Sequence, residues 1–348
     1  MQIYLNSLRR TGLDHPDLDT VPHPLADGKA AQVLVNKCPR ASVTPLVNDK
    51  MTAKAQGIAS VWIKDERSRM GLGSFKALGA AHVIARDAAE GKARGQTYIT
   101  ASAGNHGLSV AAGASAFGAK AVIYLSDTVP EAFADRLRET GAQVVRHGTH
   151  YEASMEGAAQ AAEESGAILL SDSSWPGYFE RPHVLMEGYL ILMEEVFQQI
   201  PQAPTHIFLQ AGVGGLAGAA AAAARAHWGA GPVICVVEPE AAPALQASVA
   251  AAAPVMAHGP VSAMGRLDCK EPSLIALKGL SRDADAFALI TEAEGQAGAD
   301  WAAAQDMPST PSGAAGLSGL LHLGADGRAK LGIDAESRVL LILSEGPE

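Results

Sequence analysis

The sequence is poor in cysteine and lacks any basic run. Three of its 348 residues are cysteines, Cys38, Cys235 and Cys269, and none of them forms a Cys-x-x-Cys pair. This spacing excludes a disulfide framework and gives no sign of a cysteine-based metal or redox site. The formal net charge of -10 is spread along the chain. We therefore expect neither a nucleic-acid-binding surface nor a polybasic membrane patch, and no metal site.

Long apolar runs are also missing. No run of apolar residues is long enough to span a bilayer. Residues 1–17 carry Arg9, Arg10 and Asp14 and lack the apolar centre of a signal peptide. We therefore expect a cytoplasmic protein whose partners are small molecules and a second copy of itself. With 48% hydrophobic residues the chain can bury a large core, and its length suffices for two lobes.

Short apolar, β-branched runs alternate with longer helical segments, which is typical of α/β units with a mostly parallel sheet. We assign residues 95–176 to a smaller inserted lobe and residues 1–94 plus 177–348 to a larger lobe. The predicted strands are 61–64, 96–100, 121–125, 143–145, 167–170, 205–209, 233–237 and 339–343, and the predicted helices are 74–88, 108–117, 131–140, 151–165, 184–200 and 216–228.

Lys76 is the first candidate functional residue, in Gly73-Ser74-Phe75-Lys76-Ala77-Leu78-Gly79. A lysine at a helix start is usually a solvated surface residue. Here its neighbours are small or apolar, and a lone lysine in such a close-packed stretch indicates a functional role for the amine. Free backbone N–H groups at a helix start favour anions and tend to lower the pKa of an amine. We expect Lys76 to be nucleophilic and to form a Schiff base with an aldehyde.

A glycine-rich turn, Gly212-Val213-Gly214-Gly215-Leu216, lies between a predicted strand and a predicted helix. Its backbone N–H groups could hold a phosphate monoester. A tight strand-to-helix turn that requires glycine is an equally good interpretation of this segment alone. No Gly-Lys-Ser/Thr follows, which disfavours a nucleotide P-loop, and the dinucleotide fingerprint is incomplete. An amine together with a phosphate cradle indicates pyridoxal 5′-phosphate.

Two further segments suit the same cofactor. The loop Ser102-Ala103-Gly104-Asn105-His106 offers backbone donors and an amide for a substrate carboxylate and a ring oxygen, although His106 taken alone is better interpreted as a buried structural histidine. Ser344 follows the predicted strand 339–343, and its hydroxyl could pair with an unprotonated pyridine nitrogen. An ordinary turn residue is the simpler interpretation of Ser344 alone.

Taken in order, these segments resemble the fold type II, or tryptophan synthase β-like, pyridoxal-phosphate enzymes, and among them the diaminopropionate ammonia-lyases. The resemblance implies two doubly wound α/β lobes with the cofactor in the cleft between them, and a homodimer. The motifs that carry it are Lys64-Asp65-Glu66, Gly71-Leu72-Gly73-Ser74-Phe75-Lys76, Gly104-Asn105-His106-Gly107, Trp175-Pro176-Gly177-Tyr178, Leu209-Gln210-Ala211-Gly212-Val213-Gly214, Val237-Glu238-Pro239, Glu271-Pro272, Ser312-Gly313-Ala314 and Ser344-Glu345-Gly346.

The resemblance also implies roles for individual residues. Lys76 would carry the cofactor aldehyde and, once freed, act as the base that removes the Cα proton. The cofactor would be bound by Phe75, Asn105 at the ring oxygen, Gly212, Val213, Gly214, Gly215 and Leu216 at the phosphate, and Ser344 at the ring nitrogen, while Ser102, Ala103, Gly104 and His106 would bind the substrate.

The implied reaction is α,β-elimination, which yields a 2-oxo acid and ammonia. One departure concerns Ala103, because the ammonia-lyases carry at this position an aspartate associated with proton removal from the D-substrate. The loop instead resembles that of serine and threonine dehydratases. Asp172 matches a second acid of the family and could assist an amino leaving group, although a turn or cap residue is an equal interpretation.

We therefore expect a lyase acting on a small L-amino acid, with 2,3-diaminopropionate as the first candidate substrate and preference for the L-isomer. A dehydratase of serine-like or 3-hydroxy amino acids is the second hypothesis, and a β-replacement synthase is the third. A cofactor-binding scaffold without catalysis is a different class, which the presence of Lys76, Asn105, the glycine turn and Ser344 disfavours.

Overall fold

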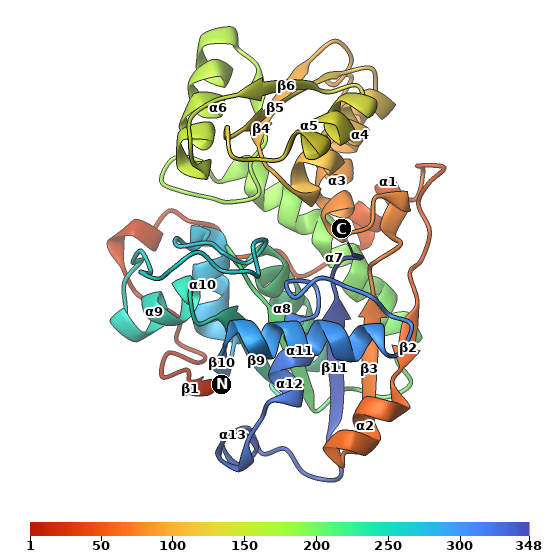
Figure 1. Ribbon diagram of the computed structural model, residues 1–348, viewed down its shortest axis with the longest axis vertical. Helices are drawn as coiled ribbons and strands as arrows, with labels where there is room; N and C mark the ends of the chain where they lie inside the picture. Colours follow the sequence, from red (N-terminus) through yellow and green to blue (C-terminus); the bar gives the residue numbers. More distant parts are fainter. Residues whose placement is uncertain (348) are drawn as a thin grey trace.

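Two separate β-sheets organise the structure, a computed structural model that describes residues 1–347. Figure 1 shows the smaller sheet and its helices above the larger sheet and its helices. The larger sheet has the spatial order β1 (Gln2–Leu5), β10 (Ala286–Ile290), β9 (Val233–Pro239), β8 (His206–Gln210), β11 (Arg338–Leu343), β3 (Ser60–Asp65) and β2 (Leu46–Asn48). The smaller sheet has the order β6 (Gln143–Arg146), β5 (Lys120–Leu125), β4 (Thr97–Ala101) and β7 (Ile168–Leu169).

Parallel pairing dominates both sheets. Every pair in the smaller sheet is parallel, and in the larger sheet only the edge strands β1 and β2 run antiparallel to their neighbours. In register, Leu341 of β11 lies between Ile63 of β3 and Phe208 of β8. These three strands therefore end at the same edge of the sheet, where ligands bind in α/β folds.

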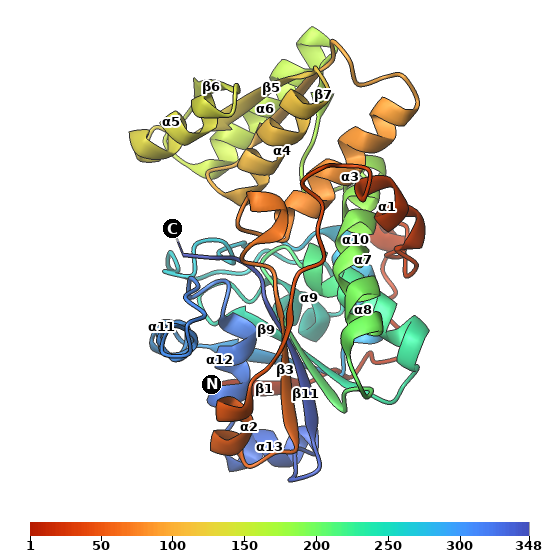
Figure 2. The same cartoon turned by 90° about the vertical axis from the view of Figure 1, so that its right-hand side faces the viewer.

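Helices cover both faces of the larger sheet and flank the smaller one. In Figure 2, α7 (Glu180–Gln199), α8 (Gly215–Trp228) and α10 (Leu274–Asp283) lie on one side of the larger sheet, and α11 (Glu292–Ala303) and α12 (Ala315–Leu321) lie on the other. The smaller sheet carries α4 (Asn105–Ala116), α5 (Glu131–Glu139) and α6 (Tyr151–Ser165). The remaining helices are α1 (Lys29–Val35), α2 (Lys50–Gln56), α3 (Lys76–Ala89), α9 (Ala244–Ala251) and α13 (Ala325–Leu331), with 3-10 turns at Pro16–Leu18 and Arg69–Gly71.

Small residues let α8 pack closely against its neighbours. The helix is rich in alanine, which favours the helical state, and residues 215–224 are buried. A Cβ atom at Gly218 would lie 3.3 Å from the Cα atom of Ala276 in α10. The helix predicted for residues 216–228 is confirmed, and the structure shows that it is tightly packed in the core. Within residues 1–347, no helix combines the length and apolar character needed to cross a bilayer.

Glu238 is a fully buried carboxyl group in β9. Its oxygens accept hydrogen bonds of 2.8 and 2.9 Å from the backbone N–H groups of Leu245 and Gln246 at the start of α9. Burial nevertheless raises the pKa of Glu238 from 4.5 to about 8. Between these two values the folded state keeps a proton that the unfolded chain releases. The contribution of Glu238 to the free energy of unfolding therefore falls as the pH rises from about 4.5 to 8.

We expect Glu238→Gln to remove this pH dependence, because glutamine keeps the shape of the protonated acid and cannot ionise. The NH₂ group of glutamine cannot accept the backbone hydrogen bond that one carboxyl oxygen of Glu238 accepts, so the variant should have the lower urea midpoint near pH 5. This deficit should shrink or reverse near pH 8, where the wild-type carboxyl group ionises. Urea unfolding at both pH values measures the difference. A variant whose midpoint differs from wild type by the same amount at the two pH values would show that Glu238 does not titrate in this range.

Candidate active site

Lys76 is the first residue of α3, at the end of an irregular loop that follows β3. Gly73 adopts a left-handed conformation, with φ of 79°, and turns the chain toward the C-terminal segment. The backbone N–H of Phe75 donates to the carbonyl of Ser344 at 3.1 Å, and that of Gly346 donates to the carbonyl of Gly73 at 2.9 Å. These bonds hold the lysine loop against the residues that follow β11. Lys76 and Ser344 therefore follow two neighbouring strands of the larger sheet, β3 and β11.

The amine of Lys76 forms an ion pair with Asp172, which follows β7 of the smaller sheet. Two aromatic rings flank this amine, since Nζ lies 5.2 Å from the ring centroid of Phe75 and 5.8 Å from that of Tyr189 in α7. The two rings pack edge to face, with centroids 4.9 Å apart. The side chain of Lys76 keeps 22% of its surface exposed, so it is not fully enclosed by the protein.

The charge state of Lys76 differs from the one predicted from its helix position. Burial disfavours the ammonium, but the ion pair with Asp172 outweighs burial and raises the pKa of Lys76 above its ordinary value. Burial likewise opposes ionisation of Asp172, yet Lys76 holds the pKa of this carboxyl well below its usual range. The expected lowering of the lysine pKa by the helix start is thus wrong. A direct carboxylate partner is stronger than the partial charge of a helix terminus.

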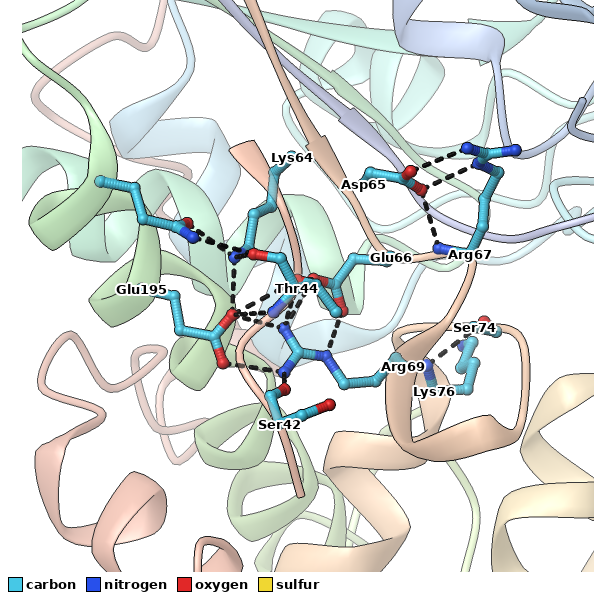
Figure 3. Close-up of polar contacts among 11 residues, drawn as sticks. Ser42, Thr44, Lys64, Asp65, Glu66, Arg67, Arg69, Ser74, Lys76 and Glu195 are labelled. Carbon is cyan, nitrogen blue, oxygen red and sulfur yellow. Dashed lines mark hydrogen bonds and ion pairs between the residues drawn. The ribbon is translucent and has the colours of Figure 1, made fainter. Parts of the chain in front are cut away.

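A buried cluster of charged side chains supports the loop that leads to Lys76 (Figure 3). The Arg69 guanidinium donates to Glu66 at 2.7 Å on both Nε and Nη2, and to both oxygens of Glu195 at 2.7–2.8 Å. Lys64 donates to Glu195 at 2.6 Å and to the carbonyl of Thr44 at 2.7 Å. All five residues are buried. Two cations and two carboxylates balance each other, and they fix the loop to α7.

The predicted glycine turn lies where β8 meets α8. Gly214 adopts a left-handed conformation, with φ of 96°. A Cβ atom at Gly212 would lie 3.0 Å from Sγ of Cys269 and 3.1 Å from the carbonyl oxygen of Arg266. Side chains other than hydrogen are therefore excluded at this turn, and the first N–H groups of α8 have no acceptor within the helix. Such a turn can hold a phosphate.

The glycine turn lies next to the ion pair of Lys76 and Asp172. A Cβ atom at Gly215 would lie 3.5 Å from the ring of Tyr189 and 3.8 Å from the carbonyl oxygen of Asp172. The amine, its carboxylate partner and the turn therefore lie close together.

The loop before α4 forms the predicted turn, and the polar side chains of Ser102 and His106 form hydrogen bonds with the protein backbone. The hydroxyl of Ser102 accepts hydrogen bonds from the backbone N–H groups of Gly104 at 3.3 Å and Gly107 at 3.0 Å. Ala103 is exposed and contributes no polar side chain. His106 is buried, and its Nε2 lies 2.8 Å from the carbonyl oxygen of Leu170. Burial lowers the pKa of His106, so the ring is neutral at pH 7. Its role toward a substrate stays a prediction.

Sequence reasoning missed four residues of this site. Tyr189 lies mid-helix, with no local pattern to distinguish it from a core residue. Cys269 was interpreted as an ordinary thiol, yet it borders Gly212, and burial raises its pKa to about 12. Arg266 and Glu345 form an ion pair of 3.1 Å beside Asn105. Only Glu345 had a visible signal, since it lies inside the motif Ser344-Glu345-Gly346.

Comparison with known families decides the cofactor. The family described as pyridoxal-phosphate dependent enzyme matches residues 39–345. The chain belongs to this family. The fold of this pyridoxal-phosphate dependent enzyme is the expected fold type II arrangement.

Its relatives include ammonia-lyases. Diaminopropionate ammonia-lyase of Salmonella typhimurium is a homologue with 31% identity, aligned over 89% of this chain and 86% of that protein. The crystal structure of Escherichia coli diaminopropionate ammonia-lyase in complex with an aminoacrylate-PLP azomethine reaction intermediate matches with a TM-score of 0.89 and 26% identity, covering 99% of this chain and 93% of that chain. An L-threonine ammonia-lyase of Geobacter sulfurreducens is 33% identical over 44% of this chain and 36% of that protein.

The residues present fit the family's cofactor. Pyridoxal phosphate needs an amine for its aldehyde and donors for its phosphate. Lys76 supplies the amine, and the glycine turn before α8 supplies a cradle that any Cβ atom at Gly212 would fill.

In the described part of the chain, no group of three or more histidine, cysteine, aspartate or glutamate side chains is arranged to hold a metal ion.

Proposed function

We propose that this enzyme is a 2,3-diaminopropionate ammonia-lyase, which converts the L-diamine and water into a 2-oxo acid and two molecules of ammonia. The ion pair between Lys76 and Asp172 carries the proposal. It places a base for the Cα proton and a carboxylate for a cationic leaving group side by side. The 31% identity to a diaminopropionate ammonia-lyase over most of both chains supports the same substrate.

In this proposal the pyridoxal ring, when bound, withdraws electrons from the substrate Cα and so acidifies its proton. The residues that would hold the cofactor are those predicted from the sequence. Lys76 would hold the aldehyde, Phe75 would pack beside it, Asn105 would donate to the ring oxygen, and Ser344 would pair with the ring nitrogen. Residues 212–216 would hold the phosphate. The substrate carboxylate binds at Ser102, Ala103, Gly104 and His106.

Lys76 performs the proton transfer. Once its nitrogen is released by the incoming substrate amine, it takes the Cα proton and becomes an ammonium. Asp172 stabilises that ammonium through the ion pair that it forms with Lys76. The flanking rings of Phe75 and Tyr189 limit access of water to the amine. The β-amino group of the substrate is already an ammonium, so it leaves as neutral ammonia and needs no proton from Lys76.

We expect Asp172→Asn to discriminate between leaving groups. A carboxylate favours the β-ammonium of the diamine, whereas it gives no comparable advantage to a neutral hydroxyl. The kcat/KM for L-2,3-diaminopropionate should fall by about 100-fold, and that for L-serine by less than about tenfold. Steady-state assays of oxo acid release measure both. Equal losses on the two substrates would remove Asp172 from the choice of leaving group.

The isomer preference depends on Ala103. An exposed methyl group cannot remove a proton, so D-2,3-diaminopropionate lacks a base on the face opposite Lys76. We expect its kcat/KM to be at least about 100-fold below that of the L-isomer, and Ala103→Asp to raise turnover of the D-isomer. Chirally pure substrates test this. Comparable turnover of both isomers by the wild-type enzyme would refute it.

A dehydratase is the second candidate. It is supported by the Ser102–Gly104 loop, by Ala103, and by the partial match to an L-threonine ammonia-lyase. The discriminating assay is 2-oxo acid and ammonia release across L- and D-2,3-diaminopropionate, L-serine, L-threonine and 3-hydroxyaspartate. Release only from hydroxy amino acids would favour the dehydratase. A β-replacement synthase, the third hypothesis, would require an added nucleophile for its characteristic product.

We further propose that residues 1–94 plus 177–348 form a large lobe and residues 95–176 form a small lobe, since each contains one of the two sheets. We also propose a cytoplasmic homodimer, on the basis of the family resemblance. Light scattering of the purified protein would give the oligomeric state, and cell fractionation would give the location.

A further inference from the structure

Glu345 is a buried carboxylate that contacts three separate segments of the site. It is 4% exposed. Its Oε2 accepts a 2.6 Å hydrogen bond from Nδ2 of Asn105. Its Oε1 lies 3.1 Å from Nη1 of Arg266 and also accepts the hydroxyl of Thr310. Its backbone pairs with Ser74 in the loop that leads to α3. One side chain thus gathers elements from distant parts of the sequence.

The bond between Glu345 and Asn105 joins the two halves of the molecule. Asn105 begins α4, which packs on the smaller sheet, whereas Glu345 follows the last strand of the larger sheet. Arg266 extends the connection. Its Nε would lie 3.5 Å from a Cβ atom at Gly104, and its carbonyl oxygen 3.1 Å from one at Gly212. Arg266 therefore borders both the loop before α4 and the glycine turn, and Glu345 contacts Arg266 and Asn105.

The hydrogen bonds of Glu345 fix the orientation of the Asn105 amide, because Arg266, Thr310 and Asn105 all donate to its two oxygens. An ionised carboxylate only accepts hydrogen bonds, so Asn105 must direct its NH₂ group, and not its oxygen, toward Glu345. Burial raises the pKa of Glu345, while the Arg266 guanidinium favours its ionised form. The amide nitrogen keeps a second hydrogen that Glu345 does not use.

We propose that Glu345 is a positioning residue that holds the Asn105 amide in the one orientation in which its second N–H can donate to the cofactor ring oxygen. The inference rests on the proposed contact of Asn105 with that oxygen. It assigns a role to the middle residue of Ser344-Glu345-Gly346, whose carboxylate contacts Asn105 directly.

Glu345→Gln tests the inference because it changes hydrogen-bond polarity at nearly constant shape. Arg266 and Thr310 both donate, so they retain the amide oxygen of the new side chain. Its NH₂ group then faces Nδ2 of Asn105. Two donors repel each other, and the Asn105 amide must turn over or move away.

The measurement is the affinity of the cofactor-free protein for pyridoxal phosphate, followed by absorbance and tryptophan fluorescence. We expect about tenfold weaker binding for Glu345→Gln and for Asn105→Ala. In the double variant, Glu345→Gln should weaken binding by less than about twofold beyond Asn105→Ala, because both act through one amide. Wild-type affinity in Glu345→Gln would overturn the inference, and so would losses that multiply in the double variant.

Asp87→Asn is the matched control. Asp87 is buried, and like Glu345 it accepts an arginine, Arg181 at 2.7 and 2.8 Å, and a hydroxyl, that of Tyr98 at 2.8 Å. It lies eleven residues after Lys76 in α3, about 16 Å along the helix. We expect similar losses of stability in the two variants, with unchanged cofactor affinity in Asp87→Asn. A matching loss of affinity there would mean that the effect of Glu345→Gln reflects general destabilisation.

Thr310→Val is the second variant, for use if Glu345→Gln does not fold. It removes one donor from the carboxylate and keeps its charge, so we expect about threefold weaker cofactor binding. Unchanged affinity would overturn the inference.

Because these titrations contain no substrate, a failure of the predicted coupling leaves the proposed elimination reaction untouched. Conversely, an enzyme inactive on the diamine can still show the predicted coupling.

Discussion

Lys76→Ala is expected to lower kcat for L-2,3-diaminopropionate by about 10³-fold or more, since it removes both the amine that holds the cofactor and the base for the Cα proton. Borohydride treatment should attach the cofactor to the wild-type protein at the peptide that contains Lys76. The same treatment should leave the variant unmodified. Absorbance and peptide mass measure the attachment, and oxo acid release measures kcat.

Lys92→Ala controls for the loss of a lysine. The Lys92 side chain is 68% exposed and pairs only with neighbouring Glu90 among the described residues, so its removal should leave kcat within about twofold of wild type. If Lys76→Ala retained more than about a tenth of the wild-type kcat, Lys76 could not be the base of the rate-limiting proton transfer.

Glu195→Ala is expected to destabilise the fold by about 3–5 kcal/mol. The substitution leaves Lys64 and Arg69 buried with only Glu66 to balance them. Burial already lowers the pKa of Lys64 although Glu195 opposes this, so the loss of the carboxylate favours release of its proton. Urea unfolding of the cofactor-free protein at pH 7 measures the change. The cluster also holds the Lys76 loop, so cofactor affinity should fall as well.

Glu131→Ala is the matched control, because Glu131 also pairs with two cations, Arg138 and Arg146. Its side chain is 62% exposed, whereas that of Glu195 is 3% exposed. Solvent therefore screens the pairs of Glu131, and its removal should destabilise the fold far less than removal of Glu195. Similar costs for both variants would show that the buried cluster adds nothing beyond ordinary surface pairing.

Much of the site could be predicted because it follows from the ends of parallel strands. Lys76, the glycine turn and Ser344 follow β3, β8 and β11, and parallel strands bring their carboxyl ends to one edge of a sheet. Their neighbours in sequence also carry local signals, such as the small residues around Lys76 and the glycines at 212–215. The alternation of apolar runs and helices likewise predicted the α/β class.

The rest depended on contacts between distant segments. Asp172 lies 96 residues after Lys76, and only the fold shows that it pairs with the lysine and reverses the expected direction of its pKa. Glu345 gains its partners at Asn105 and Arg266 in the same way. The helix predicted from residue 74 begins instead at Lys76, because Ser74 pairs with Glu345 as an isolated bridge. The edge strand Gln2–Leu5 has no alternating pattern and was not predicted.

The stoichiometry of product release from L-2,3-diaminopropionate tests the central claim most directly. Purified protein with added pyridoxal phosphate should release two molecules of ammonia for each molecule of 2-oxo acid, since both amino groups leave the substrate. Lys76→Ala, assayed in parallel, should release neither product above the rate of free cofactor. No release from the diamine by a wild-type protein that binds the cofactor and deaminates L-serine or L-threonine would contradict the ammonia-lyase assignment.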